Sequence, residues 1–194
     1  VELKIMLHDA AGQMLKDFEP THEKLAHLII VREGLDEFAH LHPTVGKTGT
    51  MTTTHTFLSG GIYLVFLDHK PAGKPAATAQ AKLVVEGDSP IAPALKANVP
   101  GTITGDGLQA EVAMRASEDK AQVLSFQVQD AEGKAVSDLQ PYLGAMGHLV
   151  VLSANGGQYV HAHPITKTAP DGKVEFEGHF PGPGTYKGWG QFQR

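Results

Sequence analysis

The chain has 194 residues, of which 41% are hydrophobic and 19% are charged, with a formal net charge of −5 and no cysteine. This composition is typical of a folded globular protein, and the lack of cysteine excludes disulfides, thiolate zinc sites and iron–sulfur clusters. The negative charge provides no basic surface for phosphates, so we expect no nucleic acid among the partners, and no apolar run predicts a membrane span.

Short segments that alternate apolar and polar residues follow one another along the chain and predict β-strands. They include "VELKIMLHD" (1–9), "LQAEVAMRA" (108–116) and "AQVLSFQVQD" (121–130), and the β-branched runs "HLIIV" (27–31) and "HLVVL" (148–152) suit central strands. Turn sequences such as "DAAG", "DAEG" and "PDGK" separate the strands. We therefore predict an all-β protein built from antiparallel β-sandwiches, either immunoglobulin-like or cupredoxin-like.

The two halves of the chain are copies of each other. Residues 1–43 align with residues 122–164 without a gap, so that "DAAGQMLKDFEP" (9–20) meets "DAEGKAVSDLQP" (130–141). An internal repeat of this length indicates a duplicated domain. We predict a first β-sandwich repeat over 1–87, a proline- and glycine-containing linker over 88–106, and a second β-sandwich repeat over 107–194.

The two repeats differ at their ends. The second begins with a strand, "GLQAEVAMRA" (107–116), whose counterpart in the first would precede residue 1, while the first closes with "AKLVVEG" (81–87). We therefore expect the second repeat to lack its last strand and each end of the chain to leave one sheet edge unpaired. A dimer mate or another partner could complete such an edge by adding a strand.

A histidine-bearing hairpin is the main functional signal. The segment "HLIIVREGLDEFAHLHP" (27–43) predicts an antiparallel hairpin around its polar, glycine-containing middle. The expected register sets Ile29 opposite His40 and His27 opposite His42. Side chains two residues apart on a strand share a face, and directly opposed Cβ atoms lie about 4.5–5.5 Å apart. Three imidazoles should therefore meet on one face, where neutral histidines bind copper or zinc.

The second repeat carries the same construction in "HLVVLSANGGQYVHAHP" (148–164), and its three histidines match although most aligned residues differ. Met146 lies two residues before this hairpin, where its thioether would favour Cu(I). The first repeat has Leu25 there instead, so the two sites need not be equivalent, and His22 could supply a further ligand. The predicted metal ligands are His27, His40 and His42 in the first repeat, and Met146, His148, His161 and His163 in the second.

We expect copper, as Cu(I) or Cu(II), to be the bound metal, with zinc as the alternative. The interpretation without metal is a buried network in which the imidazoles bond to backbone carbonyls and to each other. The remaining histidines have no histidine counterpart in the other repeat, and we expect them at the surface or rim of the domains. They are His8, His55, His69 and His179.

Three motifs of the second repeat carry a family resemblance: "YLGAMGHLVVL" (142–152), "VHAHP" (160–164) and "FPGPGTYKGWGQFQ" (180–193). Together they resemble a group of poorly characterised exported bacterial proteins that are loosely linked to copper and heavy-metal handling. The resemblance implies a periplasmic or secreted protein whose signal peptide is not part of this sequence. Blue-copper electron transfer is excluded, because blue-copper sites require a cysteine thiolate.

We expect a non-catalytic protein of the cell envelope that binds copper for trafficking or resistance, with one three-histidine site per domain. Its partners would be the metal ion and a metal-transport or envelope protein.

A metalloenzyme is one alternative, because a metal ion held by three histidines keeps an open coordination position for water or oxygen. Such an enzyme needs a general acid or base, and the acids of the first hairpin considered for this role, Glu33 and Glu37, align with Ala154 and Gln158. A structural or adhesive tandem β-sandwich is the other alternative.

Overall fold

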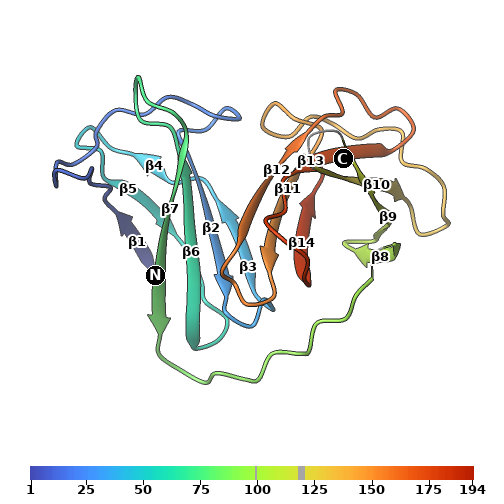
Figure 1. Ribbon diagram of the computed structural model, residues 1–194, viewed down its shortest axis with the longest axis horizontal. Helices are drawn as coiled ribbons and strands as arrows, with labels where there is room; N and C mark the ends of the chain where they lie inside the picture. The colour runs from blue at the N-terminus through green and yellow to red at the C-terminus, as the bar shows by residue number, and fades with distance from the viewer. Residues whose placement is uncertain (99, 118–120) are drawn as a thin grey trace. The chain divides into compact units, whose positions relative to one another are not determined.

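The structure is a computed structural model that describes residues 1–98, 100–117 and 121–194. Over these residues the chain forms strands and turns without a helix (Figure 1). The described residues therefore include no helix that is long and apolar enough to cross a membrane. The chain divides into two compact units, Val1–Pro93 and Ala94–Arg194. The predicted all-β class and the duplicated β-sandwich are confirmed.

The first domain is a sandwich of two antiparallel sheets. Its strands are β1 (Glu2–Ile5), β2 (Ala26–Arg32), β3 (Phe38–Leu41), β4 (Thr44–Val45), β5 (Met51–Thr54), β6 (Gly61–His69) and β7 (Ala77–Val85). One sheet has the strand order β1-β5-β4, and the other has the order β3-β2-β6-β7. Strand β2 is therefore central, with β3 on one side and β6 on the other (Figure 1).

The side chains of β2 alternate between the two faces of the sheet, so the core residues of this strand lie on one face and His27 lies on the other. Leu28 and Ile30 belong to the same buried apolar cluster as Met51 and Tyr63. Because successive side chains of a strand point to opposite faces, His27 lies on the other face of the sheet, where it is only 4% exposed. The apolar burial that holds β2 in place thus also fixes the position of His27.

The second domain contains the strands β8 (Gly101–Gly105), β9 (Leu108–Ala116), β10 (Gln122–Gln129), β11 (His148–Ser153), β12 (Tyr159–Pro164), β13 (Lys173–Gly178) and β14 (Tyr186–Gln191). They follow one another in the order β14-β11-β12-β13-β10-β9-β8. Strands β14-β11-β12 correspond to β6-β2-β3 of the first domain, and β13-β10 correspond to β5-β1. Strand β12 joins the two groups, because it pairs with β11 along its first part and with β13 at its end.

The H-x-H-P motif marks the point where the chain passes from one sheet to the other. In the first domain β3 ends at Leu41, Pro43 follows, and β4 resumes at Thr44 in the opposite sheet. Proline has no N–H group and so cannot extend the hydrogen-bonded ladder with β2. His42 is therefore held at the end of a ladder, beside the corner of the sandwich.

Strand β8 lies within the segment 88–106 that the sequence predicted as a linker. It pairs with β9 through a two-residue turn in which Asp106 and Gly107 have φ values of 52° and 75°. Asp-Gly is a favoured sequence for this type I′ hairpin turn. The second domain therefore begins before residue 107.

The two domains differ in the strands that lie beside β6 and its counterpart β14. Strand β14 pairs with β11 as β6 pairs with β2, but β6 also carries β7 along its full length. Among the described strands, β14 is the last in its sheet, and β1 is likewise the last in its own. The topology thus places β1 and β14 at sheet edges.

Candidate metal centre

Three histidines of the first domain converge on one face of the hairpin β2–β3. The observed register pairs Leu28 with Leu41 and Ile29 with His40, as predicted, so the next position brings His27 opposite His42. The ring centroids are 5.3 Å apart for His27 and His40, 4.9 Å for His27 and His42, and 4.8 Å for the last pair. One nitrogen of each ring lies within 4.8 Å of one nitrogen of the others. We call these three residues the histidine triad.

A backbone carbonyl fixes the tautomer of His27. Its Nε2 atom lies 2.8 Å from the carbonyl oxygen of Thr21, and because a carbonyl only accepts hydrogen bonds, Nε2 carries the proton. In the neutral ring Nδ1 then holds a lone pair, and it lies 3.1 Å from Nε2 of His40. A metal-binding histidine commonly donates its second N–H to a carbonyl in this way, so Nδ1 is the nitrogen of His27 that could bind a metal ion.

The carbonyl comes from a tight turn just before β2. Thr21 and Lys24 exchange both backbone hydrogen bonds across the turn, and the two central residues, His22 and Glu23, have φ values of 48° and 64°. The ring of His22 lies 6.0 Å from that of His27 in an edge-on contact. His22 is outside the histidine triad, so the turn contributes mainly through its carbonyl.

The second domain repeats this arrangement around His148. Its Nε2 atom lies 2.9 Å from the carbonyl oxygen of Tyr142, which starts a turn whose central residues, Leu143 and Gly144, have φ values of 50° and 73°. The backbone of β12 pairs His161 with Val150, as His40 pairs with Ile29. The backbone pairing and the tautomer of the first histidine are therefore the same in the two domains.

The remaining predicted ligands of the second domain are placed less fully. The side chains of His161 and His163 lie outside the described residues, so the second site stays a prediction. Met146 is 5% exposed and packs in the hydrophobic core of this domain, whereas its counterpart Leu25 is 37% exposed. The burial of Met146 is explained by its packing in the core, and its role as a metal ligand also stays a prediction.

Glu37, the acid considered for a metalloenzyme, lies on the other side of the strand from the histidines. It precedes His40 by an odd number of residues, so its side chain points to the opposite face. Its Oε2 atom accepts a hydrogen bond from the Tyr63 hydroxyl at 2.6 Å and from the Leu58 N–H at 3.3 Å. Glu37 is therefore a partner of a core tyrosine and is not directed toward the triad.

The environment shifts the pKa of both members of this pair. Burial, together with the adjacent carboxylate, raises the pKa of Tyr63 to about 12. Burial alone would raise the pKa of Glu37, but hydrogen bonds from Ser59, Tyr63 and the Leu58 amide hold it below its usual value. In the second domain Gln158 accepts the equivalent hydrogen bond from Tyr186 at 2.7 Å, so the contact is kept without the charge.

The other histidines are only partly where the sequence placed them. His8 and His179 are exposed, as expected. His69 is not at the surface: it is 6% exposed, its ring contacts Phe18 edge-on at 6.0 Å, and its Nδ1 atom lies 3.0 Å from the carbonyl oxygen of Leu67. The alternation of β6 turns His69 toward the sandwich interior, which its lack of a repeat counterpart could not reveal.

One acidic residue near the triad was missed by the sequence analysis. Asp68 on β6 is the direct cross-strand partner of His27, on the side of β2 away from His42. It is 8% exposed. The hairpin pattern could not reveal it, because the neighbour of β2 on this side comes from a strand far along the chain.

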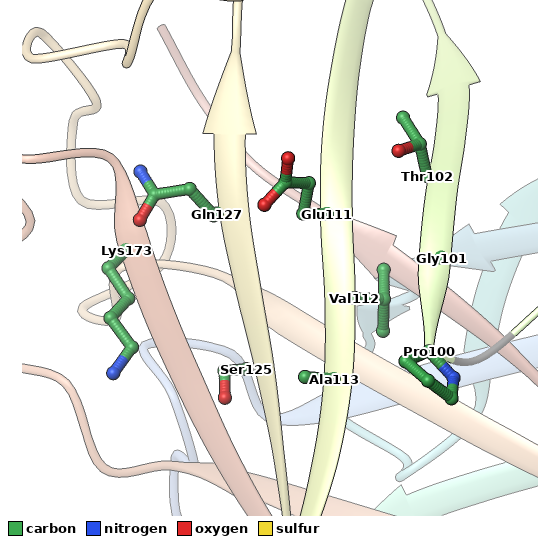
Figure 2. A pocket seen from close by; sticks show the side chains of 9 residues that line it. All are labelled: Pro100, Gly101, Thr102, Glu111, Val112, Ala113, Ser125, Gln127 and Lys173. Carbon is green, nitrogen blue, oxygen red and sulfur yellow. The ribbon is translucent and has the colours of Figure 1, made fainter.

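A shallow depression of about 560 Å³ lies in the second domain, and no histidine lines it. Figure 2 shows Glu111 and Gln127 projecting from neighbouring strands along it, with Lys173 on the next strand. Lys173 pairs with Glu175 at 3.0 Å, and Gln127 donates a hydrogen bond to the carbonyl of Asp171. The depression contains none of the predicted ligands. It is lined by Pro100, Gly101, Thr102, Glu111, Val112, Ala113, Ser125, Gln127 and Lys173.

The fold and the site together define a tandem β-sandwich protein with a histidine triad on its first domain. The chain belongs to the family described as a domain of unknown function (DUF8832), whose model matches residues 1–87 and again residues 102–194. No curated protein matches the chain. Among solved structures it is similar to S. aureus TarS, with 11% identity, coverage of 80% of this chain and 30% of that chain, and a TM-score of 0.19. A TM-score this low carries no inference about fold or function.

Proposed function

We propose that the protein binds metal ions, one in each domain, through three-histidine sites, and that copper is the ion it carries. The observation that carries this proposal is the histidine triad, whose ligand nitrogens lie within 4.8 Å of one another. Imidazole nitrogens suit both copper and zinc, and a nitrogen site binds Cu(II) more tightly than Zn(II) in the general order of affinities. Zinc is therefore the comparison ion in every test.

The orientation of the rings fits a metal site as well as a hydrogen-bonded network. A network needs an acceptor for each N–H group, and backbone carbonyls are the usual acceptors in protein interiors. In the triad, the carbonyl of Thr21 accepts the hydrogen bond from the Nε2–H of His27, so the Nδ1 lone pair of His27 faces Nε2 of His40. The same carbonyl contact recurs at His148, which supports a shared requirement for a ligand at Nδ1.

We propose binding and transfer of the metal rather than catalysis. The three acids of the first hairpin are engaged elsewhere: Glu37 accepts a hydrogen bond from Tyr63, Asp36 pairs with Arg32 at 2.7 Å, and Glu33 pairs with Lys82 at 3.1 Å. A metal-bound water at the triad would need a base within hydrogen-bond reach, and none of these three acids supplies one. The carboxylate beside the triad, Asp68, is itself held by the Thr78 hydroxyl. Delivery to a metal-transport or envelope partner fits an open coordination position, because the partner's ligand can enter there.

The proposed setting is the periplasm or the exterior of a bacterial cell, supported by the resemblance of the "VHAHP" and "FPGPGTYKGWGQFQ" motifs to exported proteins. Cell fractionation of the native host with an antibody to the chain tests this directly. Recovery in the cytoplasmic fraction alone would contradict it.

Growth of a deletion strain at raised copper tests the role in resistance. Unchanged copper tolerance would exclude that role without bearing on metal binding itself.

Metal binding is tested by competition titrations of untagged protein with Cu(I), Cu(II) and Zn(II). We expect two ions per chain, with His40→Ala plus His42→Ala removing one and His161→Ala plus His163→Ala removing the other. His8→Ala and His179→Ala are matched controls, one exposed histidine in each domain, and should leave the stoichiometry unchanged. Dissociation constants no tighter than millimolar for all three ions would overturn the proposal.

A further inference from the structure

A row of polar side chains crosses the four-stranded sheet through the histidine triad. His42 lies opposite His27, His27 pairs with Asp68 on β6, and Asp68 pairs with Thr78 on β7. Directly paired residues of neighbouring strands project from the same face, with Cβ atoms about 4.5–5.5 Å apart. A carboxylate therefore stands beside the triad on the face that the histidines occupy.

The carboxylate is held in this row. Asp68 is 8% exposed, and its Oδ1 atom accepts a hydrogen bond from the Thr78 hydroxyl. A buried carboxylate interacts more strongly with nearby charges than one in water, because the surrounding dielectric constant is lower. Asp68 does not belong to the group of residues whose ligand atoms converge, so its effect on a bound ion would act through space.

The second domain has a neutral residue at the same place. Gln191 on β14 is the cross-strand partner of His148, as Asp68 is of His27. The two positions share the same strand pairing, so the fold accepts an uncharged amide there. The position beside the first histidine is thus charged in the first domain and neutral in the second, where a carboxylate, Glu177, pairs instead with His163.

We propose that Asp68 selects the charge of the ion at the first site, so that this site prefers divalent Cu(II) or Zn(II) over Cu(I). This inference rests on the proposed metal-binding function. Coulomb attraction is proportional to the charge of the ion, so one carboxylate changes the logarithm of the affinity twice as much for a divalent ion as for a monovalent one. Asp68 acts as a positioning and tuning residue beside the ligands.

The test compares Zn(II) and Cu(I) at each site separately. The first site is measured in full-length protein carrying His161→Ala and His163→Ala, with and without Asp68→Asn. We expect a loss of about 10-fold to 100-fold for Zn(II), the range typical of residues adjacent to metal ligands, and about the square root of that factor for Cu(I). The Thr78→Val variant, which keeps the carboxylate, should change both affinities by the same small factor.

The converse change is made at the second site, in protein carrying His40→Ala and His42→Ala. Gln191→Glu should raise the Zn(II) affinity more than the Cu(I) affinity, and this gain keeps the proposal testable even if Asp68→Asn disturbs folding. Equal losses for both ions in Asp68→Asn, or no gain in Gln191→Glu, would overturn the role of Asp68. If the unsubstituted protein binds neither ion, it is the proposed metal binding that fails.

Discussion

The role of His27 depends on which of its ring nitrogens carries the proton. The Thr21 carbonyl holds that proton on Nε2, so the lone pair on Nδ1 faces the other two histidines. The sequence predicted that the three rings would meet, because the spacing and register of a hairpin are local properties. It could not predict the tautomer, which is set by a carbonyl from a turn outside the hairpin.

At the residue scale, the pairing of Glu37 with Tyr63 makes a prediction about pH. Because the pKa of Glu37 is lower in the folded protein than its ordinary value, this group stabilises the fold at pH values above about 4.5. That contribution is lost as the pH falls through the lowered pKa. In Glu37→Gln we expect about 1 kcal/mol less stability at pH 7, since a charge-assisted hydrogen bond becomes a neutral one.

The measurement is urea unfolding of wild type and Glu37→Gln at pH 7 and at pH 3.5. The difference between the two proteins should shrink at the lower pH. Glu33→Gln is the matched control, because the ion pair of Glu33 with Lys82 is largely exposed and such pairs contribute little. A difference that stays constant between the two pH values would contradict this account of Glu37.

At the scale of elements, the hairpin β2–β3 was predictable and the pairing of β2 with β6 was not. The hairpin joins neighbouring segments through a short polar turn, so apolar alternation sets its register. Strand β6 could have paired with several other strands, and so the sequence did not reveal Asp68 beside His27. The turn Asp106-Gly107 had a clear local signal, but the proline and glycine content of its surroundings obscured it.

The turn before β2 provides a prediction of its own. Glu23 has a φ of 64°, a left-handed conformation that costs a residue with a side chain roughly 1–2 kcal/mol. The second domain has Gly144 at this position. We expect Glu23→Gly to stabilise the first domain by about 1 kcal/mol, somewhat less than the strain removed, because glycine gains freedom in the unfolded chain.

Thermal or urea unfolding of Glu23→Gly would check this expectation, with Glu23→Ala as the control. Alanine removes the same carboxylate but keeps the Cβ atom, so it should give little or no stabilisation. Equal stabilisation by both substitutions would indicate that loss of charge, and not relief of strain, is the cause.

At the scale of the whole molecule, each domain has a core of its own. Ile30 lies in a buried cluster made from strands of the first domain, and Phe176 lies in one made from strands of the second. Ile30→Ala should destabilise by about 2–5 kcal/mol, and Phe176→Ala by about 3–5 kcal/mol, because each leaves a cavity. Hydrogen exchange resolved by residue should show each loss of protection in the domain that carries the substitution.

The fluorescence of the single tryptophan allows unfolding of the second domain to be measured separately. Trp189 lies on β14 of the second domain, so its fluorescence reports unfolding of that domain. Phe176→Ala should lower the fluorescence midpoint directly. A fluorescence midpoint that responds more to Ile30→Ala than to Phe176→Ala would show that the second core does not govern its own domain.

The corner at Pro43 has a consequence for the speed of metal exchange. The ladder between β2 and β3 stops at Leu41, so the end that carries His42 can fray open while the rest of the hairpin remains paired. Ends of a ladder open far more often than whole domains unfold. An ion could then enter and leave through brief opening of this end, and we expect its release rate to follow the local fraying of β3 rather than the global stability of the protein.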